Sequence, residues 1–432
     1  MQPCQQTQTS SSSQWASTAP QCRYSQAEPG PSHTNTEQRI PWWDDLTPAV
    51  RAELQLSADI PLPTQICDVI VIGGGVAGLS AALSARVAGA QVVLLEREAG
   101  LGYGATGRNA GILSAGINMG LSELSPDDPL IALWTATTRV LRSLIEEAQQ
   151  PGSLLSAHLT GALTLAESKH AARYLDREAR ARQAAGLRVE QWTPAQVAEI
   201  TTGRLNVQSV QSALWLPDEG RVQPLTLLAH LAQQARAHGI VLAGKASVRS
   251  SEEIVDALHG SHWRITLDDG RVLKTRALIQ ATGPTARPNA RIYALAFAAD
   301  LPESFPLFWD ASPYTYADFR PGNGRLGVSG GRYGKAGVTL HDERYHARLA
   351  ALTRRWLPEL AGQEPRFKWA VDLYVKPDLL PELQPLGSSA PGFSIEGLGA
   401  LGVLPGIVLG RQAGRFNPSI GPDKERCSST FS

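Results

Sequence analysis

Hydrophobic residues follow one another without interruption directly after Asp68, where the chain reads Val-Ile-Val-Ile before three glycines. A continuous apolar run of this kind is typical of a strand in a parallel sheet that is buried on both faces. Small residues over about 77–87 then predict a helix, and a second apolar run over 91–96 predicts another strand. Strand, turn, helix and strand together have the size of a βαβ unit, which is about 30 residues.

Other patterns predict a mixture of helices and antiparallel strands. Residues 128–150 and 166–185 carry apolar positions at the helical period, and we interpret them as amphipathic helices. Asp268, Asp269 and Gly270 separate two short strand-like stretches, which is a strong hairpin signal. The hairpin strands are expected at 263–267 and 271–275, further strands at 212–216 and 277–281, and a helix that begins with proline at about 224–237.

The balance of charges points to small molecules as partners. The 432 residues include 40 Lys and Arg and 40 Asp and Glu, so the formal net charge is zero. Without a basic excess, neither nucleic acid nor an anionic membrane surface is expected as the main partner. The four cysteines follow no metal-ligand spacing, and no metal site is predicted.

The chain shows no pattern of a secretory signal or of an integral membrane segment. The uncharged run 69–85 contains three consecutive glycines, whereas a membrane span needs about 20 continuous apolar residues. Residues 1–39 are rich in Ser, Thr, Gln and Pro, so we expect a disordered tail there. A reduced, cytoplasmic protein is the simplest interpretation.

The glycines after the first strand fit the spacing G-x-G-x-x-G of dinucleotide-binding proteins. Gly73 permits a tight turn, Gly75 lets the backbone approach a diphosphate, and Gly78 lets the helix pack closely on the sheet. Glu96 ends the second strand, where a carboxylate can accept ribose hydroxyls. A glycine-rich turn without a ligand is the alternative. The predicted contacts in this unit are Gly73, Gly74, Gly75, Val76, Ala77, Gly78, Glu96 and Arg97.

A second candidate loop, Gly-Ala-Thr-Gly-Arg-Asn-Ala-Gly, follows the second strand at 104–111. Thr106 can hydrogen-bond a phosphate oxygen, and Arg108 can add positive charge beside it. The alternative is a surface turn that caps a helix. The predicted cofactor contacts in this loop are Gly104, Ala105, Thr106, Arg108 and Asn109.

The stretch DVIVIGGGVAGLSAALSARVAGAQVVLLE and the loop GATGRNAG resemble the D-amino-acid oxidase superfamily of FAD-dependent oxidoreductases. They are most similar to the branch of glycine oxidase and gamma-glutamylputrescine oxidase. The resemblance implies FAD as cofactor, rather than the NAD of a Rossmann dehydrogenase, which is the alternative. Because 106–110 contains no His or Cys, it implies non-covalent FAD. The further cofactor contacts that it implies are Val248, Ala281, Thr282, Gly283, Gly397, Gly402 and Val403.

The resemblance also implies a reaction: oxidation of the C–N bond of a small amine or amino acid by hydride transfer to flavin N5, with oxygen or another electron acceptor. The glycine run at 397–402 lacks the Gly-His-Gly core of the amine-oxidising branch, which leaves open a flavin-binding protein that has lost catalysis. Leu373 stands where the resemblance implies a carboxylate-binding Arg after Trp369.

No catalytic residue follows from the sequence, and the candidates for the substrate pocket are aromatic or cationic side chains. Their alternatives are a packed sheet face for the tyrosines and solvated strand edges for the others. The candidates are Tyr314, Tyr316, Arg320, Tyr374 and Lys376.

We therefore expect an α/β fold with α+β elements. It comprises a Rossmann-like FAD-binding domain that is discontinuous in sequence, a mostly antiparallel β lobe for the substrate and a helical insertion. The expected boundaries are tails at 1–39 and 416–432, FAD-binding parts at 40–125, 211–290 and 366–415, the helical insertion at 126–210 and the β lobe at 291–365.

Overall fold

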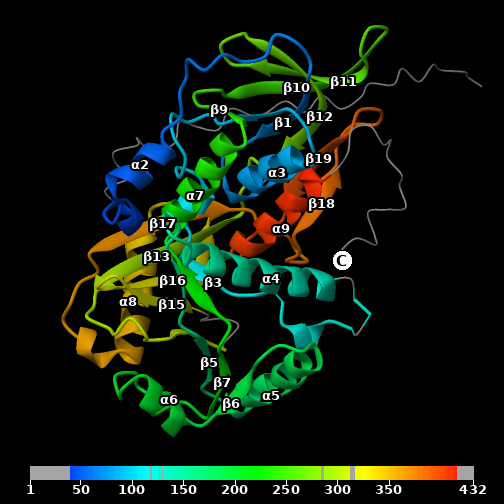
Figure 1. The fold of residues 1–432 in the computed structure, drawn as a ribbon. Helices are drawn as coiled ribbons and strands as arrows, with labels where there is room; N and C mark the ends of the chain where they lie inside the picture. The colour runs from blue at the N-terminus through cyan, green and yellow to red at the C-terminus, as the bar shows by residue number, and fades with distance from the viewer. Residues whose placement is uncertain are drawn as a thin grey trace, which may run out of the picture.

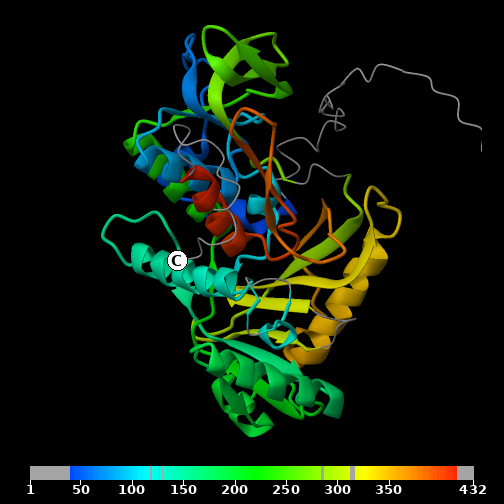
Figure 2. The same cartoon turned by 90° about the vertical axis from the view of Figure 1, so that its right-hand side faces the viewer.

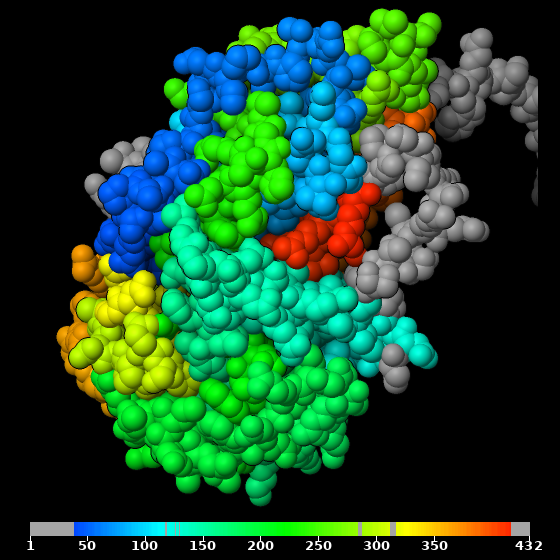
Figure 3. Space-filling view, in the orientation of Figure 1, coloured from blue at the N-terminus to red at the C-terminus, as the bar shows by residue number. Residues whose placement is uncertain are grey.

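Two large sheets, each of eight strands, organise the protein into two lobes (Figure 1). The computed structural model describes residues 39–116, 119–125, 127–128, 130–283, 287–311 and 317–415. Both predicted tails lie outside these residues, apart from Arg39. Helix α4 (Leu130–Ala148) crosses between the lobes, and its side chains form a band over the junction on the face drawn in Figure 3. The mixed α/β class expected from the sequence is confirmed.

The centre of the first sheet is the predicted βαβ unit. Strands β1 (Cys67–Ile72) and β2 (Val92–Leu95) pair in parallel on either side of the crossover helix α3 (Val76–Val87). The strand order is β10-β11-β12-β1-β2-β9, with β9 (Val241–Ala243) parallel to β2. A four-residue strand such as β2 can be fully apolar because both faces of the sheet are covered.

Alternate residues of β1 enter two different cores. Val69 and Val71 pack in one cluster with α3, α7 (Pro224–Ala237) and α9 (Val403–Gly414). Ile70 and Ile72 face the other side, where Trp263 and Ile265 of β11 (Gly260–Leu267) cover them. The helices therefore lie on one face of the first sheet, and the antiparallel meander that contains β11 lies on the other. Both arrangements can be followed in Figures 1 and 2.

Strand β12 (Val272–Gln280) joins these parts. The strands predicted at 271–275 and 277–281 form this one continuous strand, because no turn residue interrupts them. Its first half pairs with β11, which in turn pairs with β10 (Val248–Asp256), and its second half pairs in parallel with β19 (Gly392–Glu396). Strand β18 (Glu382–Pro385) pairs with β19. The C-terminal segment thus returns to the first sheet.

The second sheet is antiparallel except for one pair, β14 and β5. Its core stacks Phe308 on Phe319, with Trp356 of α8 (Asp342–Trp356) packed edge-on. Its order is β17 (Phe367–Leu373), β13 (Ala290–Ala298), β16 (Arg325–Lys335), β15 (Ala317–Gly322), β14 (Leu307–Asp310), β5 (Ala162–Ala166), β7 (Ser212–Leu216) and β6 (Glu190–Trp192).

The second sheet draws strands from beyond the segment 291–365. The segment 126–210, expected to be a helical insertion, supplies β5 and β6 besides its helices α4, α5 (Lys169–Ala184) and α6 (Pro194–Ile200). Strand β7 comes from 211–290 and β17 from 366–415. These strands are short and pair with residues far away in the chain, so local periodicity does not reveal which sheet they join.

Shorter elements complete the fold. Strands β3 (Ile112–Leu113), β8 (Gly220–Val222) and β4 (Ala157–Leu159) form a third sheet. The chain before β1 contributes the 3-10 turn η1 (Pro41–Trp43) and helix α2 (Pro48–Leu54). The remaining single turns are η2 (Ala105–Arg108), η3 (Leu121–Glu123) and η4 (Pro358–Leu360). None of the helices in the described ranges has the length and apolar character needed to cross a membrane.

Candidate functional site

The glycine turn after β1 brings three backbone segments into close contact. Gly73 has φ +107°, and a Cβ on it would lie 2.5 Å from the carbonyl oxygen of Ala281. A Cβ on Gly78 would lie 1.9 Å from the carbonyl oxygen of Gly73. The Ala281 N–H donates to Ile72 O at 2.8 Å, so the end of β12 lies directly beside the turn. Only glycine fits these two positions.

The N-terminus of α3 lies under the loop that was predicted to contact phosphate. Gly75 is the N-cap residue and has no side chain to satisfy the first N–H groups of the helix. The Thr106 hydroxyl accepts from the Val76 N–H at 3.2 Å. Free helix N–H groups together with a hydroxyl form an arrangement that binds phosphate oxygens.

Arg108 contributes the main positive charge of this loop. Its Nε is buried and has no hydrogen-bond partner among the residues that the structure describes. Burial, together with the charge of Arg97, lowers the pKa of the Arg108 guanidinium. The Arg97 side chain is 63% exposed and lies 3.3 Å from a Glu98 carboxylate oxygen. A buried guanidinium donor in the turn whose Thr106 contacts the helix N-terminus fits a diphosphate, because an anion there would supply its missing partner.

Glu96 lies at the end of β2, beside the glycine turn. Its carboxylate accepts from the Gly74 N–H at 2.7 Å and from the Glu98 N–H at 3.1 Å. Burial raises the pKa of Glu96 in spite of these two bonds. The Glu96 carbonyl accepts from the Ala246 N–H at 2.8 Å, which places the turn before Val248 next to it. Glu96, expected at the ribose, and Val248, a further expected cofactor contact, therefore lie on neighbouring segments.

Asn109 shapes its own loop. Its amide nitrogen donates to Thr106 O at 2.6 Å, and its amide oxygen accepts from the Gly111 N–H at 2.7 Å. Gly104 and Ala105 precede this turn and are exposed. The loop is thus held in shape by its own hydrogen bonds. Arg108 is its longest side chain.

The C-terminal segment approaches the same end of the first sheet. Gly397 has φ +69°, Gly402 is the N-cap residue of α9, and Val403 is its first helical residue. Helix α9 packs against α3 so closely that a Cβ on Gly410 would lie 2.3 Å from Ala77 O. Thr282 and Gly283 follow β12 at this end of the sheet.

The candidates for the substrate pocket have different environments. Tyr314 and Tyr316 lie outside the described residues. Arg320 is buried in β15, where it donates to Gly111 O at 3.4 Å and Val222 O at 3.2 Å. Burial and the nearby Arg221 lower the pKa of Arg320 to about 9. Arg320 therefore bonds to backbone carbonyls beneath the cofactor loop.

Lys376 and Tyr374 lie on the segment after β17. The Lys376 ammonium is 2.5 Å from a Glu382 carboxylate oxygen and 3.3 Å from one of Asp378. A Cβ on Gly397 would lie 2.7 Å from Lys376 Cδ, so this lysine covers the predicted cofactor segment. Tyr374 is half-buried. The structure thus brings Lys376 to the C-terminal cofactor segment, whereas Arg320 lies beside Gly111 and Val222.

Two tryptophans that sequence reasoning did not assign to the site hold the cofactor loop. The Trp42 indole donates to Asn109 O at 3.0 Å, and the Trp369 indole donates to Arg108 O at 2.9 Å. The only sequence signal for Trp42 was its place just after the predicted disordered tail 1–39, where the folded part of the chain was expected to begin.

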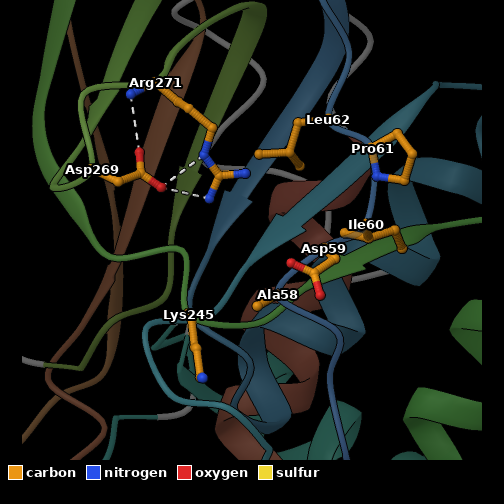
Figure 4. Close-up of a pocket in the computed structure, with 8 residues that line it drawn as sticks. All are labelled: Ala58, Asp59, Ile60, Pro61, Leu62, Lys245, Asp269 and Arg271. Carbon is orange, nitrogen blue, oxygen red and sulfur yellow. Dashed lines mark hydrogen bonds and ion pairs between the residues drawn. The ribbon is translucent and has the colours of Figure 1, made fainter.

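A surface hollow of about 570 Å³ lies near the turn at 244–248 (Figure 4). Asp269 and Arg271 form an ion pair in its wall at 2.7 Å. None of the lining residues is a predicted cofactor contact; they are Ala58, Asp59, Ile60, Pro61, Leu62, Lys245, Asp269 and Arg271.

Comparisons with known proteins agree with this geometry. The glycine oxidase structure from Geobacillus kaustophilus superposes with a TM-score of 0.66 and 21% identity, covering 80% of this chain and 93% of that one. A tRNA 5-methylaminomethyl-2-thiouridine biosynthesis bifunctional protein MnmC from Marinobacter nauticus is 24% identical over 247 residues, which are 57% of this chain and 36% of that protein. The chain thus spans about a third of the length of this curated relative.

A short stretch is more similar to a third protein. Gamma-glutamylputrescine oxidoreductase from Escherichia coli K12 is 55% identical over 47 residues, 11% of each chain. The model of the family described as DAO, FAD dependent oxidoreductase, matches residues 68–415. This match favours FAD over the NAD-linked alternative. The chain belongs to the DAO family of FAD-dependent oxidoreductases.

Proposed function

We propose that this protein oxidises the C–N bond of a small amine or amino acid. FAD, when bound, supplies the redox chemistry by accepting a hydride at flavin N5. The tasks left to the chain are to hold the cofactor, to orient the substrate and to exclude water. The support for an amino compound is the similarity to glycine oxidase and, over a short stretch, to gamma-glutamylputrescine oxidoreductase.

The observation that carries the cofactor placement is the buried, unpartnered Nε of Arg108, in the same turn as Thr106, whose hydroxyl accepts from the first N–H of α3. Thr106 and Arg108 would contact the diphosphate, and the Glu96 carboxylate would accept the ribose hydroxyls. Gly73 and Gly78 leave no room for a side chain, so the backbone itself forms the wall of this site. Val248 and the start of α9 would bound the two ends of the cofactor.

The charges near Gly397 bear on the choice between amines and amino acids. Lys376 is paired with Asp378 and Glu382. Leu373, the last residue of β17, occupies the position where the family resemblance implies a carboxylate-binding arginine. A lysine shared by two carboxylates attracts a third one weakly, and it lacks the two-pronged geometry of arginine. These contacts favour an amine without an α-carboxylate over a clamped amino acid.

The test is an anaerobic screen in which flavin absorbance is followed after each addition. The compounds are primary amines, secondary amines, D- and L-amino acids, and glycerol 3-phosphate as a substrate with a CH–OH group. Bleaching by at least one amino compound, but not by glycerol 3-phosphate, is the expected result. Bleaching by glycerol 3-phosphate alone, or by no compound in a protein that carries FAD, would contradict the proposed reaction.

A further inference from the structure

We propose that the segment Ile40–Leu56, which precedes the region matched by the family model, is a positioning element for the FAD-binding loop, with Trp42 as its positioning residue. We call residues 99–111, which include the cofactor loop 104–111, the FAD-binding loop. The family model begins at residue 68, whereas the segment Ile40–Leu56 contacts this loop at several points. The inference rests on the proposed placement of FAD beside Thr106 and Arg108.

The first contact is between backbones. The Leu56 N–H donates to Ala99 O at 3.0 Å, and the Leu101 N–H donates to Leu54 O at 2.8 Å. Gln55 and Gly100 form an antiparallel bridge between these two bonds. The chain before β1 is therefore paired through its backbone with the beginning of the loop.

The second contact is aromatic. Trp43 is 2% exposed and stacks on Tyr103 with ring centroids 5.1 Å apart. Gly102 has φ +98°, and a Cβ on it would lie 3.3 Å from the Trp43 ring. The Trp43 ring therefore supports the loop just before its phosphate-contacting residues.

The third contact reaches the turn that carries Arg108. Trp42 is 3% exposed, its indole N–H donates to Asn109 O, and its own carbonyl accepts from the Gln223 side chain at 2.7 Å. On the preceding residue, Arg108 O accepts from the Trp369 indole. Two consecutive carbonyls are thus each held by an indole N–H, which sets the direction in which the Arg108 side chain leaves the backbone.

The segment is also tied to the second lobe. The Arg320 guanidinium lies over the Trp42 ring at 4.6 Å, an arrangement that favours a cation. Asp45 is 2.6 Å from an Arg325 nitrogen. Trp42 therefore lies between the FAD-binding loop and β15 and contacts both of them.

The consequence for the cofactor is one of pre-organisation. A loop that already has its binding conformation pays less ordering entropy when FAD binds. If the loop populates that conformation only part of the time, the apparent affinity falls by the same fraction. Loss of one neutral hydrogen bond, worth about 1 kcal/mol, corresponds to about 3- to 10-fold weaker binding.

The experiment compares two Trp→Phe variants of the full chain. Trp42→Phe removes the bond to Asn109 O and keeps an aromatic ring. Trp263→Phe is the matched control, because that indole is also buried and donates to a carbonyl, Pro391 O at 2.7 Å, but does not contact the loop. The Kd for FAD and the visible absorbance and circular dichroism of the bound flavin are measured for each.

We expect Trp42→Phe to raise the Kd for FAD about 3- to 10-fold and to change the flavin spectrum, with Trp263→Phe matching the wild type in both. Wild-type values for Trp42→Phe, or equal shifts in both variants, would overturn the positioning role. If Trp42→Phe does not fold, Trp43→Leu replaces it, because it removes the ring that stacks on Tyr103 of the loop, and an unchanged Kd there would likewise overturn the positioning role of the segment. A wild-type protein that takes up no FAD would instead overturn the cofactor placement.

Discussion

Arg108 is the single side chain whose surroundings bear most directly on cofactor binding. Its buried Nε lacks a partner among the described residues, and in the proposed placement removal of the guanidinium would remove a charge-assisted bond to the diphosphate. We expect Arg108→Met to raise the Kd for FAD by about 10-fold or more. The measurement is a titration of flavin-free protein that follows the quenching of flavin fluorescence.

Arg97→Met is the comparison for that variant. Arg97 was also predicted to contact the cofactor, but it is mostly exposed and already lies beside Glu98, so its loss is expected to change the Kd less than about 3-fold. Equal effects of the two substitutions would mean that general positive charge, rather than the position of Arg108, holds the diphosphate.

Glu219 gives a prediction about pH. Its carboxylate accepts from the Ala115 N–H at 2.9 Å, and burial outweighs Arg182 at 3.7 Å and raises the pKa of Glu219 to about 7. Between its ordinary value and about pH 7, the unfolded chain loses this proton while the folded protein retains it, so stability falls as pH rises.

Glu219→Gln imitates the protonated side chain and should remove this dependence. We expect the free energy of unfolding of the wild type to fall between pH 5 and pH 8 by on the order of 2 kcal/mol relative to Glu219→Gln. Urea unfolding of both proteins at the two pH values measures the difference. Parallel pH profiles would show that Glu219 does not titrate in this range.

At the scale of residues, the sequence predicted those whose role depends on their neighbours in the chain. Gly73 and Gly78 adopt the close backbone contacts expected of them, and Thr106 lies at the helix N-terminus. Trp42 and Trp369 could not be placed, because each donates to a carbonyl far away in sequence. Arg320, which stays a candidate for the pocket, donates to the backbone carbonyls of Gly111 and Val222, a contact that the sequence did not predict.

The contact between helices α3 and α9 is the element-scale feature that brings the C-terminal segment to the site. A Cβ on Gly410 would lie 2.3 Å from Ala77 O, whereas one on Gly406 would meet its neighbours at 3.5 Å or more. We expect Gly410→Ala to destabilise the protein by about 1–3 kcal/mol, since two helix backbones must separate. Thermal unfolding with and without FAD measures the loss.

Gly406→Ala is the matched control within α9. It adds the same methyl group at an ordinary contact distance and replaces glycine in a helix interior, so a gain of up to about 1 kcal/mol is expected. Comparable destabilisation by both variants would mean that an added methyl group anywhere along this face of α9 is not tolerated, and that the close approach of Gly410 to Ala77 is not the deciding contact.

Elements with strong local patterns were predicted from the sequence, whereas the pairing of strands within the second sheet was not. The βαβ unit, α4, α5 and α7 lie close to their expected bounds. Strand β5 was missed because Ala-Leu-Thr-Leu-Ala is too short to be distinguished from a loop beside a helix. Its pairing with β14 and β7 joins three distant segments, which no local pattern encodes.

At the scale of the whole molecule, the first sheet receives its strands from separate parts of the chain, and the second sheet lies beneath the cofactor loop. Lys376 lies in the segment that runs from β17 of the second sheet back to the first. Because its charge is shared by Asp378 and Glu382, we expect Lys376→Met to leave flavin reduction by amines within about 3-fold of the wild type. Stopped-flow reduction under anaerobic conditions measures this rate.

The contrasting result for Lys376→Met is a large and selective loss with carboxylate-bearing substrates. A loss of about 100-fold with amino acids, and none with simple amines, would identify Lys376 as a carboxylate-binding residue. It would contradict the inference that its two acidic neighbours neutralise it.

The account as a whole depends on FAD lying at the N-terminus of α3, against Gly75, Thr106 and Arg108. The most direct measurement is the amount of FAD per chain in purified protein, before and after acid denaturation. The account predicts one FAD for each chain, all of it released into solution because no covalent bond holds it. Protein that contains no FAD and takes up none when it is supplied would contradict the account.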